Sequence, residues 1–71
     1  PFMCDGALAY RLAHATADHY ILLNEGAAKT VQLKTPGYRY KAVTDAITGE
    51  KVDPLAIKLG AYDGRWLRME K

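Results

Sequence analysis

Acidic side chains are the first candidates for chemistry in this chain, because a pair of carboxylates carries out glycoside hydrolysis. Retaining glycosidases hold the two groups about 5 Å apart, and inverting enzymes hold them about 6.5–9.5 Å apart. A chain of 71 residues has little room for a sugar cleft walled on both sides. Most of its acids also fall at expected turns, where they serve solubility and local hydrogen bonding. We therefore predict that none of them is catalytic and that the chain is not an enzyme. The acids are Asp5, Asp18, Glu25, Asp45, Glu50, Asp53, Asp63 and Glu70.

Histidine and cysteine are the next candidates, as metal ligands or nucleophiles. His14 and His19 could face each other across a hairpin, but no third ligand is evident for a metal ion. Cys4 is the only cysteine, so an internal disulfide is impossible, and the nearest histidine is ten residues away in sequence. We expect no metal and no cofactor.

Aromatic side chains are the most informative group, because carbohydrate-binding modules stack exposed Trp and Tyr rings on sugars. The alternative is that the rings pack, since aromatics favour strands and bury large areas. A chain with one Phe and one Trp needs its tyrosines in the core or at an interface, so we favour packing. The candidate residues for an interface or a carbohydrate site are Tyr10, Tyr20, Tyr38, Tyr40 and Trp66.

The charge pattern argues against nucleic acid and membrane partners. The net charge is only +2 and the ten basic residues are scattered, whereas a nucleic-acid binder usually carries a basic stripe. A barrel of the OB type would use aromatic and basic residues on strands, but it needs a clustered basic face. Lys34, Arg39 and Lys41 come closest to a cluster, and we interpret them as a solvated strand face. No apolar run approaches 18 residues, and no signal peptide is expected at the N-terminus.

The elements that would position these side chains have the pattern of short strands. Residues 30–34, 38–45, 55–59 and 65–70 alternate between polar and apolar side chains, which is typical of half-buried strands. Residues 8–14 are rich in alanine, which favours helix, yet they also alternate, so we predict a hairpin that turns at residues 16–18.

The expected turns divide the chain into short strands. Residues 35–38 (TPGY) fit a type II turn, residues 47–50 fit a hairpin with a partner strand over 50–52, and Asp63-Gly64 is a strong hairpin dipeptide. Together these signals predict an all-β fold, a small antiparallel, Greek-key-like β-sandwich of six to seven strands. We expect Leu55 to point inward, and the predicted core consists of Leu22, Val31, Leu33, Val43, Ile57, Leu59 and Leu67.

Four sequence segments resemble a known family. They are residues 20–24 (YILLN), 30–33 (TVQL), 45–50 (DAITGE) and 57–67 (IKLGAYDGRWL). The chain resembles, over residues 8–70, the C-terminal β-domain of glycoside hydrolases with a TIM-barrel catalytic domain, most closely that of the family 42 β-galactosidases. The shared motifs are turns and core positions rather than catalytic groups.

The resemblance implies that residues 1–71 form a single accessory domain that packs on a catalytic domain in the same protein. Pro1 at the first position fits a fragment of a larger enzyme. A core of this size supplies roughly 3–5 kcal/mol of net stability, so we expect a face with Tyr10, Tyr20 or Trp66 to pack on the parent enzyme or to form a homo-oligomer. The alternative is a carbohydrate-binding module.

Overall fold

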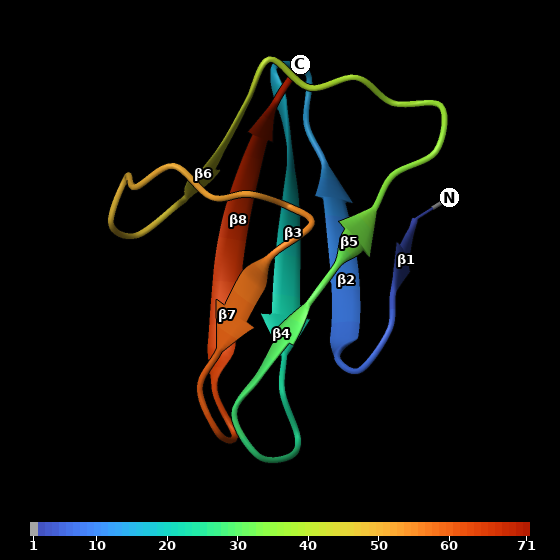
Figure 1. The fold of residues 1–71 in the computed structure, drawn as a ribbon. Coiled ribbons are helices and arrows are strands. Elements are labelled where there is room, and N and C mark those ends of the chain that lie inside the picture. The colour runs from blue at the N-terminus through green and yellow to red at the C-terminus, as the bar shows by residue number, and fades with distance from the viewer. Residues whose placement is uncertain (1) are drawn as a thin grey trace.

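The computed structural model describes residues 2–71 and is an antiparallel β-sandwich without a helix in that range. One layer is a four-stranded sheet in the order β2-β3-β8-β6, and the other consists of two short ladders, β4-β7 and β1-β5. Figure 1 shows β4, β5 and β7 crossing the near side of the four-stranded sheet. The all-β prediction is confirmed. The strands are β1 (Met3–Cys4), β2 (Leu8–Ala13), β3 (Ala17–Leu23), β4 (Lys29–Val31), β5 (Leu33–Lys34), β6 (Ala42–Asp45), β7 (Ile57–Leu59) and β8 (Gly64–Glu70).

The opening hairpin and the last strand build the larger sheet. β2 and β3 pair from Leu8↔Leu23 to Ala13↔Asp18, so the alternating N-terminal segment is a strand and not a helix. The turn lies at residues 14–17, one to two residues before the predicted position, where the His14 N–H donates to the Ala17 carbonyl at 3.0 Å. The other long edge of β3 pairs with β8, and β8 pairs with β6. β3 and β8 are therefore the central strands.

Asn24 joins the turn after β3 to the turn before β8. Its side-chain Nδ2 donates to the carbonyls of Ala27 at 3.0 Å and Gly60 at 2.8 Å, and its Oδ1 accepts from the Gly26 N–H at 3.0 Å. Asn24 is buried, so these bonds satisfy a polar group that would be costly to leave unpaired. The asparagine of the YILLN segment thus has a structural role at one end of the sandwich.

Two layers close over a core that is largely the predicted one. Six of the seven predicted core residues are buried, but Val43 is only partly buried. Val43 lies on β6, the edge strand of the large sheet, and borders an open hollow there. Tyr20 and Met69 are buried as well. The core cluster is Tyr20, Leu22, Val31, Leu33, Ile57, Leu59, Leu67 and Met69.

Three local predictions are wrong because turns or irregular loop replace the expected strand. The strand predicted over 38–45 begins only at Ala42. Leu55 is 53% exposed, since it lies in a turn where Asp53 Oδ1 accepts the Leu55 N–H at 2.9 Å, and β7 starts two residues later. The partner strand over 50–52 reduces to one bridge between Thr44 and Lys51.

The predicted strand over 30–34 is split into β4 and β5, which have different partners. This split, together with β1, explains why the described residues form eight strands rather than six or seven. The type II turn at residues 35–38 is confirmed by Gly37, whose φ is +84°, and by the Tyr38 N–H, which donates to the Thr35 carbonyl at 3.1 Å.

Candidate functional site

The four-stranded sheet has one face in the core and an opposite face, here called the outer face, that is largely apolar. The register places Tyr10, Ile21 and Trp66 in one row across β2, β3 and β8. Leu8 and Leu23 form the row on one side of it. Leu12, His19 and Arg68 form the row on the other side.

The outer face exposes large apolar side chains on three of its strands. The exposed fractions are Leu8 45%, Tyr10 54%, Leu12 62%, Leu23 39% and Trp66 42%. Aromatic side chains have about 150–250 Å² each, and with leucine taken at the lower end of that range these five leave on the order of 350–450 Å² open. A contiguous apolar patch of that size on a monomer is often a site of interaction.

Trp66 is held in place on the outer face by its neighbour on β3. Its Nε1–H donates to His19 Nδ1 at 2.9 Å, and the two rings meet edge to face with centroids 5.6 Å apart. This bond requires His19 Nδ1 to be unprotonated. The hydrogen bond and the ring contact together fix the orientation of the indole on the outer face.

The structure divides the five predicted site residues between three places. Tyr10 and Trp66 lie on the outer face, as the interface hypothesis requires. Tyr20 is wrongly predicted, because it is 0% exposed and packs edge to face against Phe2 with centroids 5.2 Å apart. Tyr38 and Tyr40 lie together in a polar cluster described below.

The aliphatic residues of the outer face were not among the site residues predicted from the sequence. The signal was the run Tyr20-Ile21-Leu22-Leu23, which is apolar at consecutive positions rather than alternating. Such a run is typical of a strand covered on both faces. Here Tyr20 and Leu22 face the core, whereas Ile21 and Leu23 face outward with no described layer over them.

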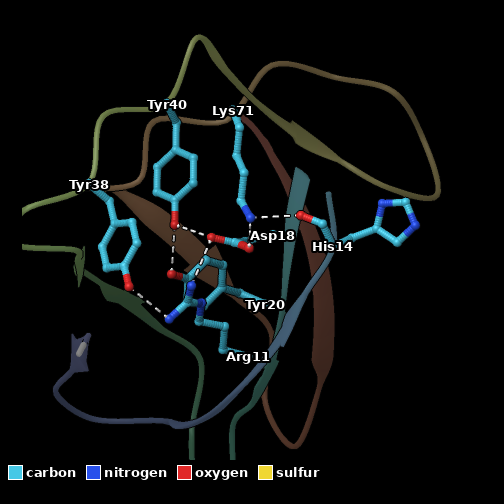
Figure 2. A network of polar contacts seen from close by, with 7 residues as sticks. All are labelled: Arg11, His14, Asp18, Tyr20, Tyr38, Tyr40 and Lys71. Atoms are coloured by element: carbon cyan, nitrogen blue, oxygen red, sulfur yellow. Dashed lines mark hydrogen bonds and ion pairs between the residues drawn. The ribbon is translucent and has the colours of Figure 1, made fainter. Parts of the chain in front are cut away.

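A second candidate site is the polar cluster of Arg11, Asp18, Tyr38, Tyr40 and Lys71, here called the Asp18 corner (Figure 2). Asp18 is 0% exposed. Its Oδ2 accepts from Tyr40 Oη at 2.7 Å and from Arg11 Nη2 at 3.3 Å, and its Oδ1 forms an ion pair with Lys71 Nζ at 3.1 Å. The geometry at Oδ1 is that of an ion pair without a hydrogen bond.

The tyrosines tie the loop before β6 to this corner. Tyr38 and Tyr40 stack with their ring planes 10° apart, and Tyr40 Oη lies 3.0 Å from Tyr20 Oη. The Arg11 guanidinium lies 4.7 Å from the centre of the Tyr38 ring and donates to Tyr38 Oη at 3.2 Å. These contacts explain why residues 38–41 leave the strand conformation that their alternation predicted.

The electrostatics of the Asp18 corner keep its carboxylate charged. Burial alone would raise the pKa of Asp18, but the hydrogen bond from Tyr40 and the positive charges of Lys71 and Arg11 beside the carboxylate outweigh burial and lower it. Burial, with the hydrogen bonds to Tyr20 and Asp18, raises the pKa of Tyr40 well above its usual value. Asp18 is thus not a proton donor at neutral pH, and the corner has the properties of a structural ion pair.

Asp45 is the other buried aspartate, and both of its carboxylate oxygens accept hydrogen bonds. Its Oδ1 accepts from the N–H groups of Ile47 at 2.8 Å and Thr48 at 3.0 Å, and its Oδ2 accepts from Arg65 Nε at 3.2 Å. The bonds from the Thr48 and Ile47 N–H groups lower the pKa of Asp45, against the effect of burial. The carboxylate of the DAITGE segment therefore stabilises the turn that follows β6.

A hollow of about 440 Å³ lies beside β6 and is lined by residues 40–44, Lys51, Val52 and Pro54. None of these residues is acidic, so the hollow has no carboxylate pair. Within residues 2–71 there is no group of three or more His, Cys, Asp and Glu placed to hold a metal ion. No helix able to cross a membrane occurs in the described part of the chain.

Comparisons with protein-family models, with curated proteins and with solved structures find no match to this chain. The resemblance to glycoside hydrolase C-terminal domains therefore rests on the residues alone.

Proposed function

We propose that this chain is a non-catalytic accessory β-domain of a glycoside hydrolase, and that its outer face docks on the catalytic domain of the same protein. The observation that carries the proposal is the exposed apolar surface on the side of the sheet away from the core. Interfaces between domains of one chain typically bury about 600–1,500 Å². The apolar centre of the outer face exposes on the order of 350–450 Å², with His19 and Arg68 at its margin. This area is a large part of the smallest such interfaces.

The chemical composition of the outer face supports docking to protein over binding to sugar. Three leucines and an isoleucine share the surface with only two aromatic rings. Aliphatic side chains pack well against another protein surface, whereas sugar recognition relies on flat rings with polar groups close by. Leu12, the most exposed of the five at 62%, lies near the end of β2 and suits such a contact.

The occupied carboxylates support the non-catalytic part of the proposal. Asp18 and Asp45 are buried acids, and each is committed to ion pairs and hydrogen bonds that keep it charged. A glycosidase needs one carboxyl group with a raised pKa as the acid. Neither residue has that property, and no carboxylate lines the hollow beside β6.

The test compares Leu12→Lys in the isolated chain and in the longer protein that contains it. In the isolated chain the substitution is at an exposed site and should change the free energy of unfolding by less than about 0.5 kcal/mol. In the longer protein it should lower the melting temperature of this domain, because a charge would be buried in the interface.

Ile47→Lys is the matched control, because Ile47 is 79% exposed but lies in the turn after β6 and not on the outer face. It should be neutral in both proteins. Equal effects of Leu12→Lys and Ile47→Lys in the longer protein would contradict docking through the outer face.

Carbohydrate binding is the second candidate, favoured by one specific observation. Tyr10 and Trp66 lie in the same row two strands apart, roughly 9.5 Å from strand to strand, and Trp66 is fixed by His19. Because Trp66 is the only tryptophan, its fluorescence reports binding directly. A saturable change on titration with oligosaccharides, lost in Tyr10→Ala, would favour this function over docking.

A further inference from the structure

The outer edge of β2 is an unpaired strand edge with a defined set of hydrogen-bonding groups. Among the described residues, β2 pairs only with β3, and β1 pairs with β5 instead. Opposed residues in an antiparallel ladder alternate between pairs that exchange hydrogen bonds and pairs that do not. The His14 N–H donates to the Ala17 carbonyl, so these two opposed residues form a bonded pair. Every second pair along the ladder from there is also bonded, and these are the pairs that Leu12, Tyr10 and Leu8 form with β3.

It follows that Ala9, Arg11 and Ala13 direct their N–H and C=O groups away from β3. These three residues have no backbone partner from residues 2–71 at that edge. The free edge thus carries three donors and three acceptors along six residues of regular strand.

This edge has few of the devices that usually prevent strand addition. Natural edge strands are protected by Lys, Pro, a bulge, an inward-pointing charge or a covering segment. β1 lies near β2 but does not pair with it. β2 has no Pro, Lys or acid. Its one charge, Arg11, points to the core side, where Asp18 and Tyr38 hold it. The side chains on the outer face beside the edge are Leu8, Tyr10 and Leu12.

We propose that β2 pairs with β2 of a second copy of this chain, antiparallel and about a two-fold axis at Tyr10. In this register Tyr10 opposes Tyr10 in a pair without hydrogen bonds, and Leu8 opposes Leu12 of the second copy on the outer face. Ala9 and Arg11 oppose each other and exchange hydrogen bonds. The two four-stranded sheets become one continuous sheet of eight strands.

The register follows from which side chains oppose each other. Shifting the pairing by two residues in one direction would place Arg11 opposite Arg11, and like charges directly opposite are destabilising. A shift in the other direction would place Leu12 opposite Gly6, which lies before β2 begins. With the axis at Tyr10, each Arg11 opposes an alanine, and the outer-face pairs are aromatic with aromatic and leucine with leucine.

The dimer is weak and concentration-dependent, because few contacts hold it. Cross-strand pairs of this kind contribute roughly 0.2–1 kcal/mol each. The contact between two strand edges is also small beside standard protein interfaces.

The proposal is independent of docking through the outer face, because it uses the strand edge. Its first test is sedimentation velocity of the chain over a range of concentrations. A reversible dimer is expected for the unchanged chain. Ala9→Pro should raise the dissociation constant by roughly tenfold or more, because it removes an outward N–H and blocks the edge.

Leu23→Lys is the matched control, because Leu23 lies on the outer face but on β3, away from the edge. It should leave the dimer intact, whereas a face-to-face dimer would be lost. A chain that stays monomeric, a dimer unaffected by Ala9→Pro, or a dimer abolished by Leu23→Lys would each overturn the proposal.

Cross-linking tests the register even if Ala9→Pro were to unfold the chain, and it uses a Cys4→Ser background to remove the native thiol. Tyr10→Cys should oxidise readily to a disulfide-linked dimer, since the two cysteines would face each other across the axis. Leu12→Cys is the control, because Leu12 is more exposed than Tyr10 but opposes Leu8 of the second copy. Equal cross-linking of the two variants, or none with Tyr10→Cys, would refute the register.

Discussion

Replacing Asp18 by Asn removes the one charge on which the Asp18 corner depends and leaves its shape nearly unchanged. The carboxylate is 0% exposed, accepts hydrogen bonds from Tyr40 at 2.7 Å and Arg11 at 3.3 Å, and faces Lys71 at 3.1 Å. Hydrogen bonds to a charged group contribute about 1.5–3 kcal/mol each. The longer bond lies at the low end of that range, and the two cations are partly exposed and can be hydrated again.

We therefore expect Asp18→Asn to lower the free energy of unfolding by about 3 kcal/mol, the lower limit for breaking a buried ion pair. For a domain of this size each kcal/mol shifts the melting temperature by about 4–8 °C, so the expected shift is roughly 12–24 °C. Asp53→Asn is the matched control, because Asp53 is an exposed turn aspartate. It should change stability by less than about 0.5 kcal/mol.

The acid dependence of stability gives a second measure of the same residue. The pKa of Asp18 is lowered in the folded chain from an ordinary value of 3.8. Its stabilisation is therefore present in full above that value and is lost as the pH falls through the folded pKa. Urea unfolding between pH 7 and pH 2 should show a smaller acid-induced loss for Asp18→Asn than for the unchanged chain. A variant within about 0.5 kcal/mol of the parent, or identical losses of stability in acid, would refute this role of Asp18.

Three further substitutions have expected outcomes. Ile57→Ala, at a core position that is 0% exposed, should cost about 2–5 kcal/mol and abolish a cooperative thermal transition by circular dichroism; a sharp transition would contradict the described packing. Asp45→Ala should cost about 2 kcal/mol in urea unfolding, because it removes the acceptor of two backbone N–H groups, whereas Glu50→Ala should be close to neutral. Gly37→Ala should cost about 1 kcal/mol from backbone strain alone, since φ is +84° and a Cβ there meets nothing within 4 Å; no change in melting temperature would argue against that conformation.

Local patterns in the sequence predicted the fold well where a strand has one buried face. Val31 and Leu33, and likewise Ile57 and Leu59, alternate with polar side chains and are buried as expected. The turn at Pro36-Gly37 was predicted from residue chemistry that depends on two positions only. Such features are local, so the sequence around them is sufficient.

The failures occur where distant residues decide the conformation. Tyr38 and Tyr40 alternate like a strand, but their hydroxyl and ring contacts with Arg11 and Asp18 hold them in a loop. This arrangement does not follow from spacing, because it depends on which segments the folded sheet brings together. Leu55 was expected inside, but a turn closed by the side chain of the residue two positions earlier leaves it exposed.

The candidate site was only half predictable for the same reason. Tyr10 and Trp66 were identified as interface candidates, and they do lie in one row of the outer face. Tyr20 was included wrongly, since in a strand with apolar residues at consecutive positions the side that faces the core depends on register. The register with β2 and β8 places Tyr20 inside and Ile21 outside.

Side-chain footprinting with hydroxyl radicals, read by mass spectrometry, tests the docking proposal most directly. The measurement compares the oxidation rates of individual residues in the isolated chain and in the longer protein to which the docking proposal assigns it. We expect Tyr10, Leu12 and Trp66 to be strongly protected in the longer protein, while Tyr62, 79% exposed in the turn before β8, reacts equally in both. Equal reactivity of Tyr10 and Trp66 in the two proteins would contradict the claim that the outer face is covered.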